Sequence, residues 1–217
     1  MTVTSPPQPM QTRLQQEIAA CETVAEVINI AVTAEALAVT LLGAAVDSAQ
    51  QGALALTNEQ IEVLQAARIE EKAHYDYLMA AGAQPLTETF NIPDPAIATD
   101  VPTFLTTLIA LEEAFIAAYM AAVQVFSQRD QFDLVLVAMR AAAVEADHRA
   151  HARFYAIEAG IIDGVPNNLA FETALFTSVG AAAQALIDLG FIGGDGPEIT
   201  FPGPTPIVNP GVTNLEP

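Results

Sequence analysis

Apolar residues recur every three to four positions along four long stretches of the chain, which is the spacing of one face of an α-helix. The pattern predicts helices over about 14–49, 58–81 and 131–159, and a further helix that starts after Asp100 and ends between about 127 and 130. Alanine is abundant in these stretches, and no proline interrupts the first of them. Long helices with one apolar face each are typical of a helical bundle.

The breaks between these stretches predict how the helices connect. Thr57 to Gln60 fits a capping box at the start of the second helix, and Gly160 fits the end of the fourth. The connection between the first two helices is short, so these helices are expected to be antiparallel neighbours. The segment 83–100 contains three prolines and is long enough to cross from one end of a bundle to the other. The predicted fold class is all-α: a four-helix bundle with a long crossover between its second and third helices.

The same pattern divides the chain into four segments. A flexible leader is predicted at 1–14 and the bundle at 15–160. A C-terminal helical appendage follows at 161–192, with an amphipathic helix over about 171–189. The last segment, 193–217, is rich in Gly and Pro and is expected to be extended and packed on the bundle or on a partner.

Charge and composition exclude several classes of function. Of the 217 residues, 52% are hydrophobic, which is typical of a folded chain, and the formal net charge is −19. Such a surface repels nucleic acid and anionic membranes but attracts cations. The first ten residues lack a basic segment followed by an apolar run, so no export signal is visible and a cytoplasmic location is expected. No uncharged apolar run reaches the roughly 18 to 20 residues that cross a bilayer, so no membrane partner is expected.

Two short motifs place polar side chains on otherwise apolar helix faces. The sequence Glu71-Lys72-Ala73-His74 lies in the second predicted helix, and Glu145-Ala146-Asp147-His148 lies in the fourth. Residues three apart on a helix point in the same direction, so each Glu and His can reach one common point. The two motifs therefore predict that a carboxylate and an imidazole converge from each of two helices.

Two more carboxylates interrupt apolar stripes in the middle of the other two helices. Glu35 lies in the stripe of the first helix, and Glu112 is in phase with Phe104 and Phe115 in the third. Glu113 is the alternative to Glu112, because it aligns with a second, less bulky stripe of the same helix. The bulkier stripe favours Glu112.

Four buried carboxylates close together repel one another, and each would be costly to bury unpaired. Two divalent cations would balance their four charges, and two neutral imidazoles can add nitrogen ligands. Because Cys21 is the single cysteine, a thiolate cluster is excluded and any metal must be held by oxygen and nitrogen. One Glu from each of two helices and Glu-x-x-His from each of the other two is the ligand set of di-iron and di-manganese bundles. The predicted metal ligands are Glu35, Glu71, His74, Glu112, Glu145 and His148.

Other polar residues on these helices have simpler interpretations. A single Glu-x-x-His is more often a solvated pair than a ligand pair, but two of only three histidines in the chain fall in the two copies. Tyr119 lies on the face of Glu112, and core packing is favoured over a redox role. Glu62, Glu70 and Glu158 are interpreted as solvated. No separate nucleophile or acid–base group is evident beyond the predicted metal ligands, and no other cofactor-binding residue is predicted.

The chain resembles the ferritin-like superfamily over about 24–159. The motifs that carry the resemblance are Ala34-Glu35, Glu71-x-x-His74, Leu111-Glu112 with Tyr119, and Glu145-x-x-His148. A closer similarity is to the ferritin-like group that includes plant desiccation-related and fungal stress-response proteins, through 171–173 and the Pro-rich C-terminal end. The resemblance implies two Fe or Mn ions, reactions with O₂ or H₂O₂, and a homo-oligomer, with a dimer favoured. The chain departs from the family pattern at Leu42, where a tyrosine is expected, and it lacks the Cys pairs of a rubredoxin-type electron donor.

Two hypotheses of different classes follow from these residues. In the first, Glu71 and Glu145 bridge two redox-active metals, Glu35 and Glu112 are terminal ligands, and the centre detoxifies peroxide or oxidises Fe(II). In the second, the protein is a stress or desiccation structural protein whose metal pair stabilises the fold. A third hypothesis, mineral storage, would need a closed shell of many subunits. The Pro-rich tail makes such an assembly less favoured. The sequence does not choose between Fe and Mn, because a carboxylate-rich site with two histidines accepts either.

Overall fold

Helices α2 (Val24–Gln50) and α3 (Asn58–Ala80) form the first antiparallel pair of the structure, a computed structural model that describes residues 22–202 and 206–217. Each helix begins at a capping box, which joins the N-cap residue to the residue three positions later. The hydroxyl of the N-cap residue accepts the backbone N–H of that later residue, whose side chain accepts the backbone N–H of the N-cap residue. The box at Thr57 and Gln60 is as predicted. A second box, at Thr23 and Glu26, starts α2 at Val24, so the prediction of one helix continuing from residue 14 is wrong at this point. Residues 14–21 and the predicted leader lie outside the described residues.

Helices α4 (Val101–Gln128) and α5 (Phe132–Glu158) form the second pair. The carboxylate of Asp100 caps α4 by accepting the N–H of Thr103 at 3.0 Å, and Pro102 lies in the first turn, where its missing N–H costs nothing. Helix α5 is followed by Gly160 at φ 68°, a left-handed conformation that ends a helix at little cost for glycine. The predicted bounds of these helices are therefore confirmed to within about two residues.

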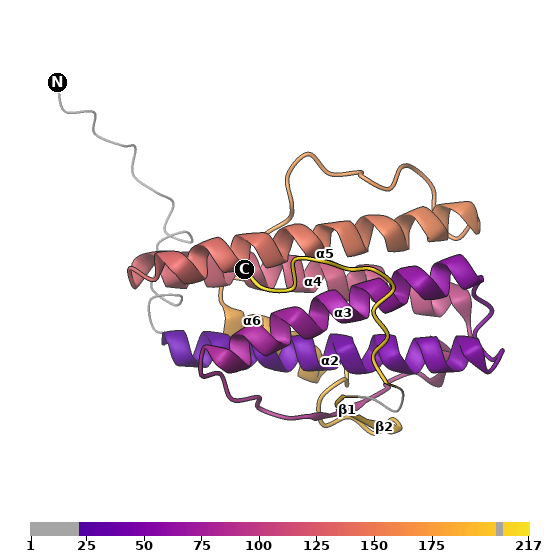
Figure 1. Cartoon of the computed structure of the whole chain (residues 1–217), viewed down its shortest axis with the longest axis horizontal. Helices are drawn as coiled ribbons and strands as arrows, with labels where there is room; N and C mark the ends of the chain where they lie inside the picture. The colour runs from indigo at the N-terminus through magenta and orange to yellow at the C-terminus, as the bar shows by residue number, and fades with distance from the viewer. Residues whose placement is uncertain (1–21, 203–205) are drawn as a thin grey trace.

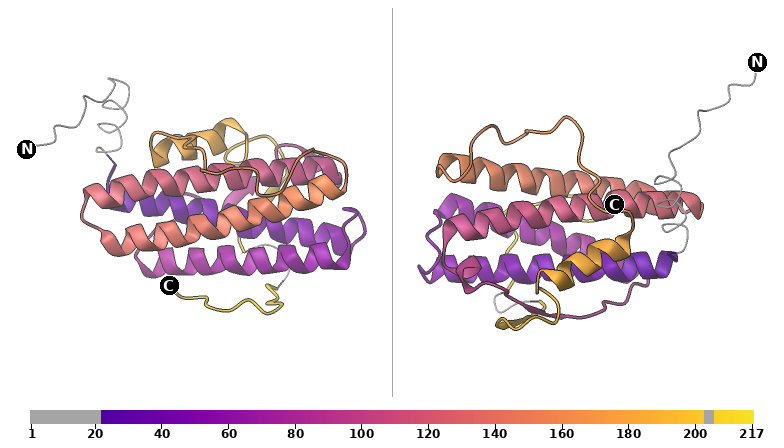
Figure 2. Two further views of the ribbon diagram at one scale, coloured as in Figure 1. Left: turned by 90° about the horizontal axis from the view of Figure 1, so that it is seen from above. Right: turned by 180° about the vertical axis from the view of Figure 1, so that it is seen from behind.

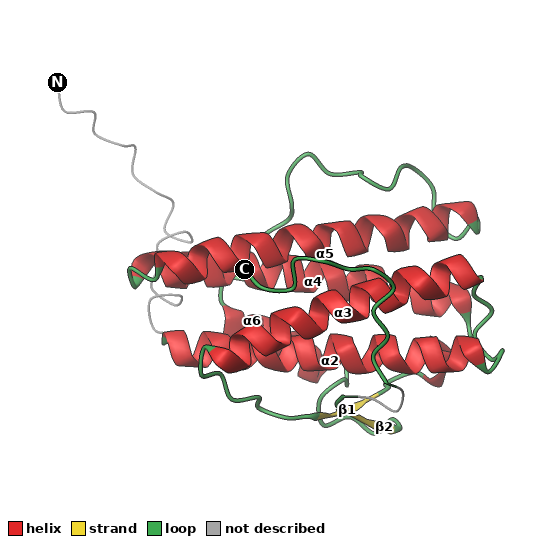
Figure 3. Ribbon diagram, in the orientation of Figure 1, coloured by secondary structure: helices red, strands yellow, loops and turns green. Residues whose placement is uncertain are grey.

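The two pairs lie side by side and make a four-helix bundle (Figures 1 and 2). The chain between α3 and α4 runs the length of the bundle, which confirms the predicted crossover and the all-α fold class. The crossover also contains a short strand, β1 (Thr89–Asn91), and a 3₁₀ helix, η1 (Pro95–Ala98). Strand β1 pairs antiparallel with β2 (Glu198–Thr200) from the C-terminal tail (Figure 3). This small two-stranded ribbon was not predicted, because its partners are more than 100 residues apart.

The helix after the bundle is shorter than predicted. Helix α6 (Val179–Asp188) covers only the second half of the predicted 171–189, and Phe171 is 90% exposed on a segment that is not helical. The helix starts at Ser178, whose hydroxyl accepts the N–H of Ala181. Glu22, which precedes α2, accepts the N–H groups of Val179 and Gly180 at 3.1 and 2.6 Å. A distant carboxylate thus stabilises the N-terminus of α6, which sequence periodicity cannot reveal.

The core of the bundle is filled mainly by α2 and α4. Helix α2 buries Leu37 and Leu42 and α4 buries Phe104 and Ile116, all with at most 2% exposure. Both helices are long and apolar enough to cross a membrane by length and composition when up to two charged residues are tolerated, although neither contains the uncharged apolar run of 18 residues that the sequence analysis looked for. However, 72% and 56% of their most apolar windows are buried inside the bundle, as is usual for core helices.

Candidate metal centre

The structure brings all six predicted ligands together in the middle of the bundle. Glu35 comes from α2, Glu71 and His74 from α3, Glu112 from α4, and Glu145 and His148 from α5. The four carboxylates are at most 3% exposed. Glu113 is only half-buried and belongs to neither of the two groups of converging ligand atoms, so the geometry favours Glu112.

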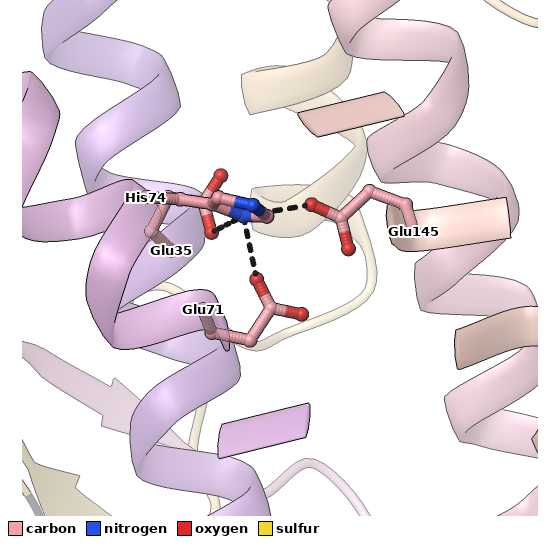
Figure 4. Close-up of side chains that lie close together, drawn as sticks. All are labelled: Glu35, Glu71, His74 and Glu145. Atoms are coloured by element: carbon pink, nitrogen blue, oxygen red, sulfur yellow. Dashed lines mark ion pairs between the residues drawn. The ribbon is translucent and has the colours of Figure 1, made fainter. Parts of the chain in front are cut away.

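The first group surrounds the ring of His74, with Glu35, Glu71 and Glu145 as its other members (Figure 4). Nδ1 of His74 lies 3.5 Å from Oε2 of Glu35, 3.5 Å from Oε2 of Glu71 and 3.3 Å from Oε1 of Glu145. These side chains come from three different helices and point at one another. Such a set of three oxygens and one nitrogen suits a divalent cation such as Fe²⁺ or Mn²⁺.

The second group surrounds His148 on the other side of the shared carboxylates. Nδ1 of His148 lies 3.1 Å from Oε1 of Glu71, 3.2 Å from Oε2 of Glu145 and 3.8 Å from Oε2 of Glu112. In each of the two groups, the ligand atoms lie within 4.8 Å of one another. The second group therefore repeats the first, with Glu112 in the place of Glu35.

Glu71 and Glu145 belong to both groups, and each divides its two oxygens between them. Oε2 of Glu71 is directed to His74 and Oε1 to His148, while Oε1 of Glu145 is directed to His74 and Oε2 to His148. A carboxylate that offers one oxygen to each of two positions is arranged to bridge two metal ions. The two halves of the bundle each supply one such carboxylate.

Unpartnered polar atoms in the cluster test whether the residues fit a pair of cations. Within the described chain, Oε2 of Glu35, both oxygens of Glu71, Oε2 of Glu112, Oε1 of Glu145 and Nδ1 of His74 are buried without a hydrogen bond. Buried polar atoms without a partner are rare, because leaving one unpaired costs about 1–3 kcal/mol or more. Two divalent cations would neutralise the four carboxylates and give these atoms partners. The residues therefore fit a two-cation site.

The protonation of the cluster without metal follows from burial and from its own charges. Burial, together with the charge of Glu71, raises the pKa of Glu35 to about 8. Burial also raises the pKa of Glu112 well above its ordinary value, even though His148 opposes the shift. Although burial by itself lowers the pKa of a histidine, the surrounding carboxylates hold the pKa of both His74 and His148 well above the ordinary value. The raised pKa values mean that cations would have to displace protons from the cluster when they bind.

Two residues that the sequence analysis assigned to other roles contact the cluster. Oε2 of Glu70, predicted to be solvated, lies 2.8 Å from Nε2 of His148. A carboxylate on the outer nitrogen fixes the ring and favours a proton on Nε2, which leaves Nδ1 free to bind a metal. The hydroxyl of Tyr119, predicted to pack in the core, donates a hydrogen bond to Oε1 of Glu35.

The sequence indicated contact with the cluster for Tyr119 but not for Glu70. Tyr119 is seven residues from Glu112 and lies on the same apolar stripe, so a hydroxyl directed into the cluster was foreseeable. Glu70 lies outside the stripe that carries Glu71 and His74, so periodicity gives no signal for it.

Comparison with known proteins gives the family. The family model described as a ferritin-like domain matches residues 23–158, which include all four bundle helices and all six predicted ligands. The chain belongs to the ferritin-like domain family. The match confirms the resemblance at the level of the superfamily and supports a ferritin-like metal protein. Neither the curated proteins nor the solved structures give a match to this chain.

Proposed function

We propose that this ferritin-like protein binds two Fe or Mn ions and reacts with O₂ or H₂O₂, so that it detoxifies peroxide or oxidises Fe(II) in stress protection. The proposal rests mainly on the division of the oxygens of Glu71 and Glu145 between the two histidines. His74 and Glu35 would hold one ion, and His148 and Glu112 the other. Bound Fe or Mn would pass electrons between the reactants by changing oxidation state, which the side chains of the cluster do not do.

The residues of the chain position the ions and exclude water. The four carboxylates are buried among apolar side chains, where charge interactions are stronger than in water. Tyr119 holds Glu35 through its hydroxyl, and burial together with the charge of Glu35 raises the pKa of Tyr119 well above its ordinary value, so the tyrosine keeps its proton. Glu70 holds the ring of His148 from the outside. Disproportionation of two H₂O₂ to two H₂O and one O₂ would need no external reductant.

The test is metal analysis combined with turnover on one preparation. We expect two Fe or Mn per chain, and consumption of H₂O₂ or oxidation of added Fe(II) by the loaded protein. Loaded protein without either activity would contradict the redox proposal. A protein that binds no Fe or Mn after reconstitution would contradict the metal site as well.

The second candidate function is a structural one, favoured by the buried carboxylate oxygens that lack a hydrogen bond. Folding would then depend on the metals, because within the described chain several buried carboxylate oxygens of the cluster have no hydrogen-bond partner, which bound cations would supply. Two tightly bound ions without turnover, together with a loss of thermal stability on chelation, would support this candidate over the first.

The proposal also includes a homodimer, which follows from the family resemblance alone. Light scattering on the purified protein tests it directly: a mass of about twice 22.8 kDa supports the dimer, and a mass of 22.8 kDa contradicts it.

A further inference from the structure

A cavity of about 380 Å³ lies beside the cluster, between α3 and α5. These two helices contact each other at few positions, whereas α2 packs closely on α3 and α4 on α5. His74 and Tyr119 are among the residues that line it, with their ring centroids 6.5 Å apart in an edge-to-face arrangement. The cavity therefore reaches one member of the His74 group directly.

The walls of this cavity are mainly apolar. Helix α5 contributes Leu134, Val137, Ala141 and Val144, which recur at helical spacing along one face, and α4 contributes Phe126. The volume exceeds twice the roughly 150 Å³ of an apolar cavity that binds benzene, and it falls within the roughly 300–1,000 Å³ of small-molecule sites. A space of this size and lining suits an apolar organic molecule.

The C-terminal segment Val212–Pro217 covers the cavity. In Figure 1 the yellow chain end crosses α3 and lies between α3 and α5, and residues 212–217 are among the lining residues. Among the described residues, every hydrogen bond made by 206–217 stays inside that segment, between Asn209 and residues 211 and 212. The cover is therefore held on the bundle by side-chain packing, without a hydrogen bond from the described helices, and it can move away at little cost.

The charges around the cavity favour a neutral ligand. The lining contains two basic residues, Arg140 and His74, and two acidic residues, Glu70 and Glu216. An anionic ligand would also meet the overall negative charge of the chain. Apolar walls whose few basic and acidic residues are equal in number give an ion no net attraction, which leaves uncharged molecules as the favoured class.

We propose that this cavity is the binding site for a small neutral apolar molecule, such as a medium-chain alcohol or aldehyde, which reaches the His74 side of the cluster beneath a movable C-terminal cover. This inference rests on the proposed function in that it gives the metal pair an organic substrate class. The binding site itself requires only the cavity and its cover.

The cavity is tested by binding of the neutral fluorescent probe N-phenyl-1-naphthylamine to the full chain, with 1-octanol as competitor. We expect saturable one-to-one binding that 1-octanol displaces. Val137→Trp fills the cavity and should weaken binding at least tenfold. Met139→Trp on the same helix is the matched control, because Met139 is 59% exposed and does not line the cavity; it should change binding less than twofold. Val144→Phe is the second filling variant if Val137→Trp does not fold.

The cover is tested by removing residues 211–217. Stopped-flow mixing should show that the probe associates at least tenfold faster with the shortened chain, and Val137→Trp should still weaken binding at least tenfold in that background. Equal association rates in the two chains would overturn the cover. Probe affinity unaffected by the filling variants, or absence of saturable binding in the full and the shortened chain, would overturn the site.

Metal content measured on the same samples separates this inference from the proposed function. Probe binding requires no turnover, so a redox-inactive cluster leaves the result unchanged. Tight binding of two metals without probe binding overturns the cavity assignment alone.

Discussion

Replacing Glu71 by Gln tests the shared-carboxylate geometry most directly. Glu71 is fully buried and gives one oxygen to each of the two groups. Glutamine keeps the volume of the side chain but removes its charge and one of its two oxygens as a metal ligand. Both sites should therefore weaken together, whereas the loss of a terminal ligand should weaken only one.

The expected change in melting temperature can be calculated from the free energy that metal binding adds to folding. At a free metal concentration 1,000 times the dissociation constant, each site adds about 4 kcal/mol to the free energy of unfolding, or about 8 kcal/mol for two sites. In a domain of this size each kcal/mol raises the melting temperature by about 2–4 °C, so metal should raise it by about 16–32 °C. Loss of an outer hydrogen-bond partner already costs 10–100-fold in metal affinity, so loss of a bridging ligand should cost at least about 100-fold at each site. The gain then falls to about 3 kcal/mol, or about 6–12 °C.

The assay is a pair of melting curves for each variant, with and without Mn²⁺, combined with metal analysis. The difference between the two curves removes any change that Gln itself makes to the metal-free protein. Glu62→Gln is the matched control, because Glu62 is exposed on the same helix and should keep the full shift and two ions. If Glu71→Gln keeps both ions and the wild-type metal-induced shift, Glu71 does not bridge and the reasoning is wrong.

Three further predictions follow from the same structure. Glu112→Gln should reduce the metal content from two ions to one while Glu113→Gln keeps two, as measured by metal analysis; the reverse result would exchange their roles. Metal binding at pH 7 should release protons, because burial and then the charge of Glu71 raise the pKa of Glu35 to about 8, so that its carboxyl group is still largely protonated. The apparent metal affinity should therefore rise with pH up to about 8. Calorimetry in two buffers of different ionisation heat would detect the released protons. Gly43→Ala should lower the free energy of unfolding by about 1–3 kcal/mol in denaturant melts, because the added Cβ would lie 2.6 Å from the buried guanidinium of Arg68. An unchanged denaturation midpoint would show that Arg68 moves aside freely.

Local signals in the sequence determined the helices and most of the cluster. The three-residue spacing in Glu71-x-x-His74 sets both side chains on one helix face, and the apolar stripe around them directs that face inward. Turn and capping residues such as Thr57 and Asp100 act within four positions of themselves, so the helix starts they mark were predictable. Four carboxylates at core positions then required neutralisation, and two histidines at matching positions offered nitrogen ligands, which indicated metal without any knowledge of the tertiary structure.

Contacts between residues far apart in the chain were decided only by the tertiary structure. Glu70 lies off the apolar stripe, and it meets His148 because α3 and α5 place them together. The pairing of β1 with β2 and the capping of α6 by Glu22 likewise depend on how the bundle brings remote segments together. The cover over the cavity has the same origin, since a Gly- and Pro-rich tail carries no periodic signal for the surface on which it packs. Short-range spacing therefore determined which residues form the cluster, and packing between remote segments determined their surroundings.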